Sequence, residues 1–216
     1  MNNDLTEIVF ILDRSGSMTG LEKETISGYN SFLEKQKKLE KEAVVTTVLF
    51  DDEYEVIHNR VNIININPLT GKEYYTRGST ALLDAIGKTI KTIYSNHLSI
   101  LYENRPGQVI FVIITDGYEN ASREFTYPQI RHMINERIEK DKWEFIFLGA
   151  NMDAIKQASD LGIAPTRAAN YHADADGTSI NFSVLNDAIL ELRILHKLNE
   201  DWKKDIDEDF NKRSNK

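Results

Sequence analysis

The stretch FILDRSGSM, residues 10–18, joins an apolar run to one carboxylate and two hydroxyls. Asp13 closes the run, and Ser15 and Ser17 follow it at alternate positions. Continuous apolar runs are typical of strands in a parallel sheet that is buried on both faces, and ligands bind at the carboxyl edge of such a sheet. We therefore expect Asp13, Ser15 and Ser17 to lie together at a binding edge.

The run that ends at Asp13 is one of four continuous β-branched and aromatic runs in the chain. They occupy residues 7–12, 44–50, 108–115 and 143–149, and each is typical of a strand buried between helices. A further run, residues 54–64, alternates more and follows the second run after a gap too short for a helix. It is expected to pair antiparallel at the edge of the sheet. A weak last strand is expected near residues 167–171.

Apolar residues at helical spacing separate these strands. Helices are expected around residues 26–33, 82–93, 127–138 and 153–161, and a long helix is expected after Gly177. Strands that alternate with helices predict an α/β fold, with a doubly wound, mostly parallel six-stranded sheet, one antiparallel edge strand and helices on both faces. The expected arrangement is Rossmann-like.

The composition limits the classes of function. The 216 residues carry a formal net charge of -8, with lysines and arginines interspersed among acids, so no nucleic-acid partner is expected. The absence of cysteine excludes disulfides, zinc–thiolate sites and thiol nucleophiles. The sequence contains neither a basic, apolar leader nor a bilayer-length apolar stretch, so we expect a soluble, cytoplasmic protein without a membrane partner.

Two more oxygen-bearing residues are expected at the same edge of the sheet. Thr80 stands in RGSTALLDAI at the start of a helix, and Asp116 ends the strongest apolar run, in VIITDG. With Asp13 and the two serines they offer two carboxylates and three hydroxyls, which are ligands for a hard cation such as Mg²⁺. Two carboxylates only just cancel a divalent charge, so the ion would still attract an outside anionic oxygen.

DRSGSM, the threonine of GSTALLDAI and the aspartate of ITDG together resemble the metal-ion-dependent adhesion site of von Willebrand factor type A (VWA) domains. The full D-x-S-x-S…T…D set is present in order, and the resemblance is to stand-alone domains of bacterial or phage type. It covers roughly residues 5–195 and suggests a VWA domain at residues 1–196, followed by a charged helical extension at residues 197–216.

The resemblance implies a metal-dependent protein-binding module rather than an enzyme. Its metal ligands would be Asp13, Ser15, Ser17, Thr80 and Asp116. They would hold Mg²⁺, with Mn²⁺ or Ca²⁺ as alternatives, and an acidic side chain of a partner protein would complete the coordination. Around this site we expect a partner-binding rim, which consists of Tyr74, Tyr75, Arg77, Tyr118 and Glu119.

Two other functions remain open at this point. The first is a Mg²⁺-dependent phosphatase with Asp13 as nucleophile and Asp116 holding the metal. Ser15 counts against it, because phosphatases of this type place an acid two residues after the nucleophile. The second is a scaffold that assembles through its C-terminal helix, where an apolar stripe from Leu198 to Phe210 either packs within the chain or forms an oligomer seam.

Two acidic stretches are expected to have structural roles. DDE at 51–53 is expected to be a solvated hairpin turn. HADADG at 172–177 lacks the ligand pattern of a calcium loop, because a histidine occupies its first ligand position. Asp174 or Asp176 is therefore expected to cap the helix that follows.

Overall fold

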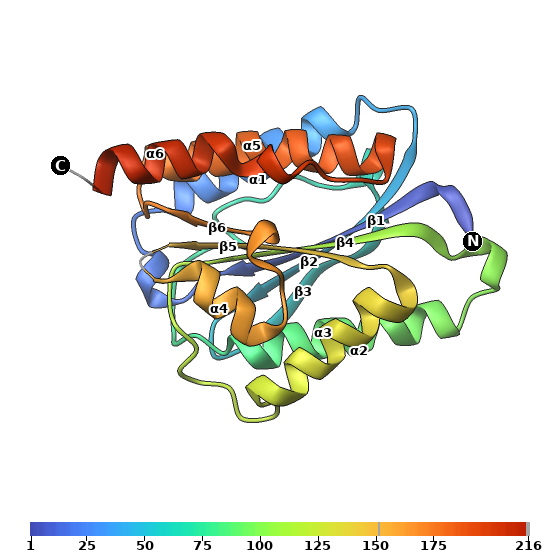
Figure 1. The fold of residues 1–216 in the computed structure, drawn as a ribbon, viewed down its shortest axis with the longest axis horizontal. Helices are drawn as coiled ribbons and strands as arrows, with labels where there is room; N and C mark the ends of the chain where they lie inside the picture. Colours follow the sequence, from blue (N-terminus) through green and yellow to red (C-terminus); the bar gives the residue numbers. More distant parts are fainter. Residues whose placement is uncertain (151, 215–216) are drawn as a thin grey trace.

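The computed structural model describes residues 1–150 and 152–214 and has three layers, with a sheet between two layers of helices (Figure 1). The sheet contains β1 (Asn2–Asp13), β2 (Glu42–Phe50), β3 (Tyr54–Asn62), β4 (Pro106–Thr115), β5 (Glu144–Ala150) and β6 (Ala168–Tyr171). The helices are α1 (Glu22–Gln36), α2 (Leu82–Leu98), α3 (Tyr127–Asp141), α4 (Ala154–Leu161), α5 (Ala175–Leu195) and α6 (Lys204–Ser214).

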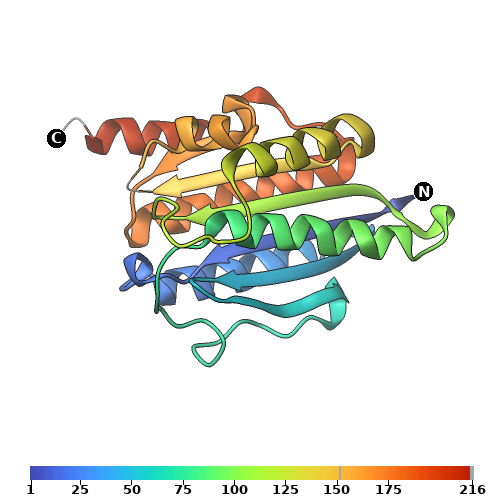
Figure 2. The same ribbon diagram turned by 90° about the horizontal axis from the view of Figure 1, so that it is seen from below.

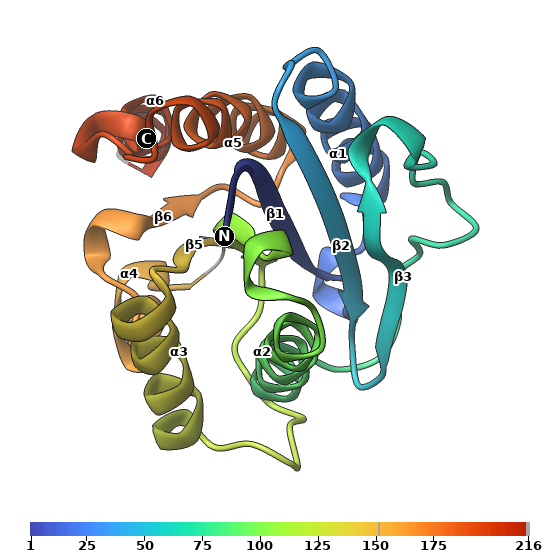
Figure 3. The same ribbon diagram turned by 90° about the vertical axis from the view of Figure 1, so that its right-hand side faces the viewer.

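The strand order is β3-β2-β1-β4-β5-β6. Every neighbouring pair is parallel except β2 and β3, which pair antiparallel. The edges of the sheet are β3 on one side and β6 on the other (Figure 3). This confirms the predicted doubly wound sheet with one antiparallel edge strand.

The two faces of the sheet explain why the central runs are continuously apolar. On β1, Ile8 and Phe10 belong to the core cluster that packs against α1, α5 and α6. Val9 and Ile11 belong to the cluster under α2, α3 and α4, which covers the face seen in Figure 2. Because successive side chains of a strand point to opposite faces, a strand covered on both sides needs apolar residues at every position.

The segment after α5 packs onto the rest of the chain. Leu198, Trp202 and Ile206 are buried in the same cluster as the α5 side chains, so the apolar stripe packs within the chain. Trp202 Nε1 donates a hydrogen bond to Thr166 O (2.8 Å), and Lys203 Nζ donates one to Ala168 O (2.7 Å). The segment thus occupies carbonyl groups beside the edge strand β6.

The N-cap of α5 follows the predicted chemistry. Asp174 is the N-cap of α5, and its side chain accepts a hydrogen bond from Gly177 N at 2.9 Å. This confirms the structural role expected for that aspartate. Among the helices of residues 1–150 and 152–214, none has the length and apolar content needed to cross a membrane.

Candidate metal site

The candidate site lies at the carboxyl ends of the two central strands. Asp13 is the last residue of β1, and Asp116 directly follows β4. These strands are neighbours, and the chain leaves them toward opposite halves of the sheet, since β2 lies beyond β1 and β5 lies beyond β4. This is the topological switch point at which open α/β sheets bind their ligands.

The loop after β1 brings the two serines to the second aspartate. Asp13 Oδ1 accepts a hydrogen bond from Ser15 N at 2.7 Å, which turns the chain sharply after the strand. Ser15 Oγ lies 3.1 Å from Ser17 Oγ, and Ser17 Oγ donates to Asp116 Oδ1 at 2.5 Å. A continuous chain of polar contacts therefore joins the first aspartate to the second.

Thr80 reaches the same place from the segment before α2. A Cβ on Gly117 would lie 3.2 Å from Ser17 Oγ and 3.2 Å from Thr80 Oγ1, so the two hydroxyls converge beside this glycine. Thr80 N donates to Asn120 Oδ1 at 2.9 Å, and Thr80 O accepts from Asn120 N at 3.0 Å. The structure thus brings all five predicted ligands together.

Burial raises the pKa of both carboxyl groups in this cluster. Asp13 is 1% exposed, and burial raises its pKa from 3.8 to about 6, against the hydrogen bonds from Thr115 and Ser15. The charge of Asp116 raises it further. Burial also raises the pKa of Asp116, which is 2% exposed, against the hydrogen bond from Ser17. The site holds two buried carboxyl groups whose negative charge favours a bound cation.

The unpaired atoms of the site fit a divalent cation. Asp116 Oδ2 is buried and has no hydrogen-bond partner among the described residues. Such an atom is costly to bury unless something else satisfies it. In the part of the chain that the structure describes, no group of three or more Asp, Glu or His side chains could hold a metal. A cation here would therefore depend on hydroxyl ligands besides its two carboxylates.

Tyr74 was predicted to lie in the partner-binding rim, but the structure places it in the interior. It is 1% exposed, and its hydroxyl donates a hydrogen bond of 2.5 Å to Asp13 O. Burial raises its pKa well above the ordinary value. Its place in the rim is therefore corrected: Tyr74 supports the end of β1 from inside the protein, and its ring is not available to a partner.

The other predicted rim residues differ in exposure. Tyr75 is 44% exposed and Tyr118 is 54% exposed, so both rings are accessible. Arg77 donates to Asp51 Oδ2 at 2.7 Å and to Glu53 Oε2 at 2.5 Å, which occupies its guanidinium. Glu119 accepts hydrogen bonds from Leu83 N (2.9 Å) and from backbone groups of its own loop. Its carboxylate therefore organises the loop after Asp116.

Asp51 contradicts the predicted solvated turn at residues 51–53. It is fully buried, and its Oδ2 accepts from Arg14 Nε at 3.0 Å as well as from Arg77. Its two neighbours in the turn are exposed, as expected. A run of acids between two strands carries no signal that one of them is buried, because the two arginines lie far away in the sequence.

Thr115 is a further site residue that the motif does not mark. Its hydroxyl donates to Asp13 Oδ2 at 2.6 Å, so this threonine occupies the second oxygen of the first aspartate. It is the last residue of β4 and is fully buried. Only the pairing of β1 with β4 brings the two side chains together.

No family model and no curated protein sequence matches the chain. Solved structures do match. Proximal thread matrix protein 1 from the mussel byssus, with a zinc-occupied metal-ion-dependent adhesion site, superposes with a TM-score of 0.56 at 14% identity, over 84% of this chain and 44% of its own. A von Willebrand factor type A protein from Catenulispora acidiphila has a TM-score of 0.56 at 13% identity, over 85% of this chain and 42% of its own.

The manganese-loaded TRAP protein from Plasmodium vivax gives a TM-score of 0.54 at 13% identity, over 83% of this chain and 72% of its own. The chain spans less than half the length of the first two proteins. At such low sequence identities these matches show that the backbone folds are similar, and they show the fold alone.

Proposed function

Because this chain has the von Willebrand factor type A fold, we propose that it is a metal-dependent module that binds a partner protein. One observation carries the proposal: two buried carboxyl groups and three hydroxyls from three separate segments meet at the carboxyl edge of the sheet. This donor set suits a hard divalent cation.

Asp13, Ser15, Ser17, Thr80 and Asp116 would hold the ion, with Mg²⁺ as the first candidate and Mn²⁺ or Ca²⁺ as alternatives. When bound, the ion supplies positive charge that the neutral hydroxyls leave available to an outside carboxylate. Asp116 Oδ2, which is buried without a partner among the described residues, is the atom best prepared to receive it. Zinc and manganese in two proteins of the same fold support the choice of a divalent metal.

The partner would contribute an Asp or Glu side chain to the ion. Ser17 is the exposed member of the ligand set, so the partner would approach over the loop after β1. Tyr75 and Tyr118 offer accessible aromatic surface for the contact. The net charge of -8 favours a protein partner over a nucleic acid. A cytoplasmic location and a bacterial or phage source stay predictions; fractionation of the source cells would test the location.

The phosphatase alternative finds less support in the geometry. The position two residues after Asp13, where phosphatases of this type place the general acid, is Ser15, whose hydroxyl lies 3.1 Å from Ser17 Oγ. A serine in this place cannot shuttle a proton at neutral pH. The scaffold alternative is also less supported, because Trp202 and Ile206 of the apolar stripe are buried within the chain and are not available as an oligomer interface.

Thermal unfolding with added metal tests the proposal. Millimolar Mn²⁺ or Mg²⁺ should raise the Tm of the wild-type protein, since a ligand that binds only the folded state stabilises it. Asp13→Ala should abolish this rise. Asp205→Ala is the matched control, because it removes the same charge from an exposed position on α6. A well-folded wild-type protein whose Tm ignores both metals would refute the proposal.

A further inference from the structure

Three segments far apart in the sequence are joined beside the candidate metal site. They are the serine loop (residues 14–18), the β2–β3 turn (residues 51–53) and the Thr80 segment (residues 70–81). Arg77 N donates to Arg14 O at 2.9 Å, and Gly16 N donates to Gly78 O at 3.1 Å. Ala81 N donates to Asp51 O at 2.8 Å. The backbones of all three segments are thus held to one another.

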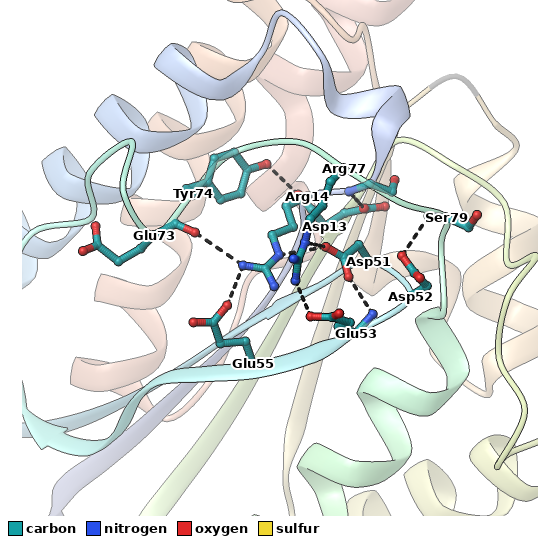
Figure 4. Close-up of polar contacts among 11 residues, drawn as sticks. Asp13, Arg14, Asp51, Asp52, Glu53, Glu55, Glu73, Tyr74, Arg77 and Ser79 are labelled. Carbon is teal, nitrogen blue, oxygen red and sulfur yellow. Dashed lines mark hydrogen bonds and ion pairs between the residues drawn. The ribbon is translucent and has the colours of Figure 1, made fainter.

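Asp51 lies at the centre of this junction (Figure 4). Its Oδ2 accepts from Arg14 Nε at 3.0 Å and from Arg77 Nε at 2.7 Å, and its Oδ1 accepts from Glu53 N at 2.6 Å. Asp51 and Arg14 are both fully buried. One carboxylate therefore joins an arginine of the serine loop to an arginine of the Thr80 segment.

The positions of the two arginines connect this junction to the metal ligands. Arg14 stands between Asp13 and Ser15, and Arg77 precedes Thr80 by three residues. Gly78, between Arg77 and Thr80, has φ +65, and a Cβ there would lie 1.9 Å from Asp52 Oδ1. The Thr80 segment therefore turns tightly against the β2–β3 turn, and the ion pairs of Asp51 hold it there.

From this geometry we infer that Asp51 is a positioning residue for the proposed metal site, which sets the placement of Thr80 relative to Ser15 and Ser17 without touching the ion. The inference rests on the proposed function. Groups that orient metal ligands affect affinity although they make no bond to the metal. Guanidinium groups suit this role because they pair with a carboxylate in a fixed planar geometry.

Substitution of Arg77 and of Asp51 distinguishes a positioning effect on the metal ligands from a purely electrostatic effect on Mn²⁺ binding. If charge alone mattered, Arg77→Gln would remove a positive charge near a cation site and strengthen Mn²⁺ binding, whereas Asp51→Asn would weaken it. If Asp51 positions the ligands through Arg77, both substitutions weaken binding. Asp51→Asn leaves buried Arg14 with Glu55, at 2.6 Å, as its remaining ion-pair partner among the described residues and destabilises the fold, so Arg77→Gln, at a partly exposed position, is the deciding variant.

The matched control is Lys72→Gln. Lys72 lies in the same Thr80 segment, is exposed, and its ammonium has no hydrogen bond or ion pair with any described residue. Calorimetric titration with Mn²⁺ in wild type, Arg77→Gln, Asp51→Asn and Lys72→Gln gives four dissociation constants. Circular dichroism and the Tm in chelator establish that each variant is folded.

We expect Arg77→Gln to raise the Kd for Mn²⁺ about tenfold or more, with Lys72→Gln unchanged or slightly tighter. Asp51→Asn, if folded, should weaken binding at least as much. An Arg77→Gln protein that binds Mn²⁺ as tightly as wild type, or more tightly, overturns the inference while leaving the metal site intact. A wild-type protein that binds no Mn²⁺ overturns the proposed function itself.

Discussion

At the scale of single residues, Asp13 shows how burial and metal binding oppose each other: burial favours the protonated carboxyl group, whereas a metal ion needs the carboxylate. Burial raises its pKa to about 6, although two hydrogen bonds favour the ionised form. A metal needs the carboxylate, so a proton and a cation compete for the same group. Thr115 favours the cation in this competition, because its hydroxyl donates to Asp13 Oδ2.

This competition predicts how stability depends on pH in chelator. The folded-state pKa of Asp13 is raised from 3.8 to about 6, so the protonated form favours folding. The corresponding stabilisation is fully present below the unfolded-state pKa and is lost as the pH rises through about 6. Lowering the pH from about 8 to about 4 should therefore stabilise wild type relative to Asp13→Asn by on the order of 3 kcal/mol. Denaturant unfolding of both proteins across this range measures the difference.

With Mn²⁺ present the trend should reverse for wild type, because protons displace the metal as the pH falls. The other carboxyl groups titrate in both proteins, so the difference between them reports the titration of Asp13 together with its coupling to Asp116. Equal slopes of stability against pH in wild type and Asp13→Asn would contradict the raised pKa.

The individual ligands could be predicted from the sequence, but the residues that support them could not. Asp13 and Asp116 each stand at the end of an apolar run, where the carboxyl edge of a parallel sheet is expected. Asp51 and Arg14 gain their roles only from contacts across 37 positions of sequence. Tyr74 was misplaced for the same reason: its spacing from Thr80 shows that it is near the site, but only the packing shows that its ring is buried.

At the scale of elements, α1 and α5 approach each other closely at Gly28. A Cβ on this glycine would lie 2.2 Å from the ring of Phe182, so the helices can pack here only without a side chain. Both helices cover the same face of the sheet (Figure 1). The close approach fixes where α5 lies above the central strands.

Gly28→Ala should destabilise the protein although alanine favours helices. The gain in helix propensity is about 1 kcal/mol, whereas forcing a methyl group into a packed interface costs about 1–3 kcal/mol. The expected net result is a lower free energy of unfolding, measured with denaturant. Ser27→Ala, one residue away and exposed, is the control and should be neutral or slightly stabilising. A stabilised Gly28→Ala protein would show that Phe182 can move aside.

Strand and helix types were predictable because their periodicity is strong, and the limits of the elements were less so. β1 begins at Asn2, several residues before the apolar run, since Asn2 pairs with Pro106 of β4 and Leu5 pairs with Glu42 of β2. Such an extension depends on a neighbouring strand and has no hydrophobic signal of its own. The hairpin of β2 and β3 was predictable from its short connection alone.

At the scale of the whole molecule, the segment after α5 completes the fold at the β6 edge. Its tryptophan and lysine occupy carbonyl groups of residues 165–168, and Ile206 adds to the core. His172, just after β6, stacks on Phe210 with ring centroids 4.8 Å apart. The edge of a sheet that loses such cover becomes a template for pairing with other chains.

Truncation after residue 196 should therefore lower stability and promote self-association. The loss of buried Leu198, Trp202 and Ile206 removes apolar contacts worth roughly 1.5–3 kcal/mol for each side chain. Light scattering and sedimentation of the truncated chain, compared with the full chain at equal concentration, measure the association. Truncation after residue 210, which retains those three side chains, is the control. A monomeric, equally stable protein ending at residue 196 would show that the edge needs no cover.

β1 begins near one end of the sheet and α6 ends near the other (Figure 1). Arg213 pairs with Asp174, close to where β6 ends, so the C-terminal helix finishes on the same side as the metal ligands. Met1 precedes β1 at its amino end. A protein immobilised through its first residue would therefore present the site outward to bulk solution, whereas a bulky group attached at Ser214, the last residue of α6, would crowd whatever docks there.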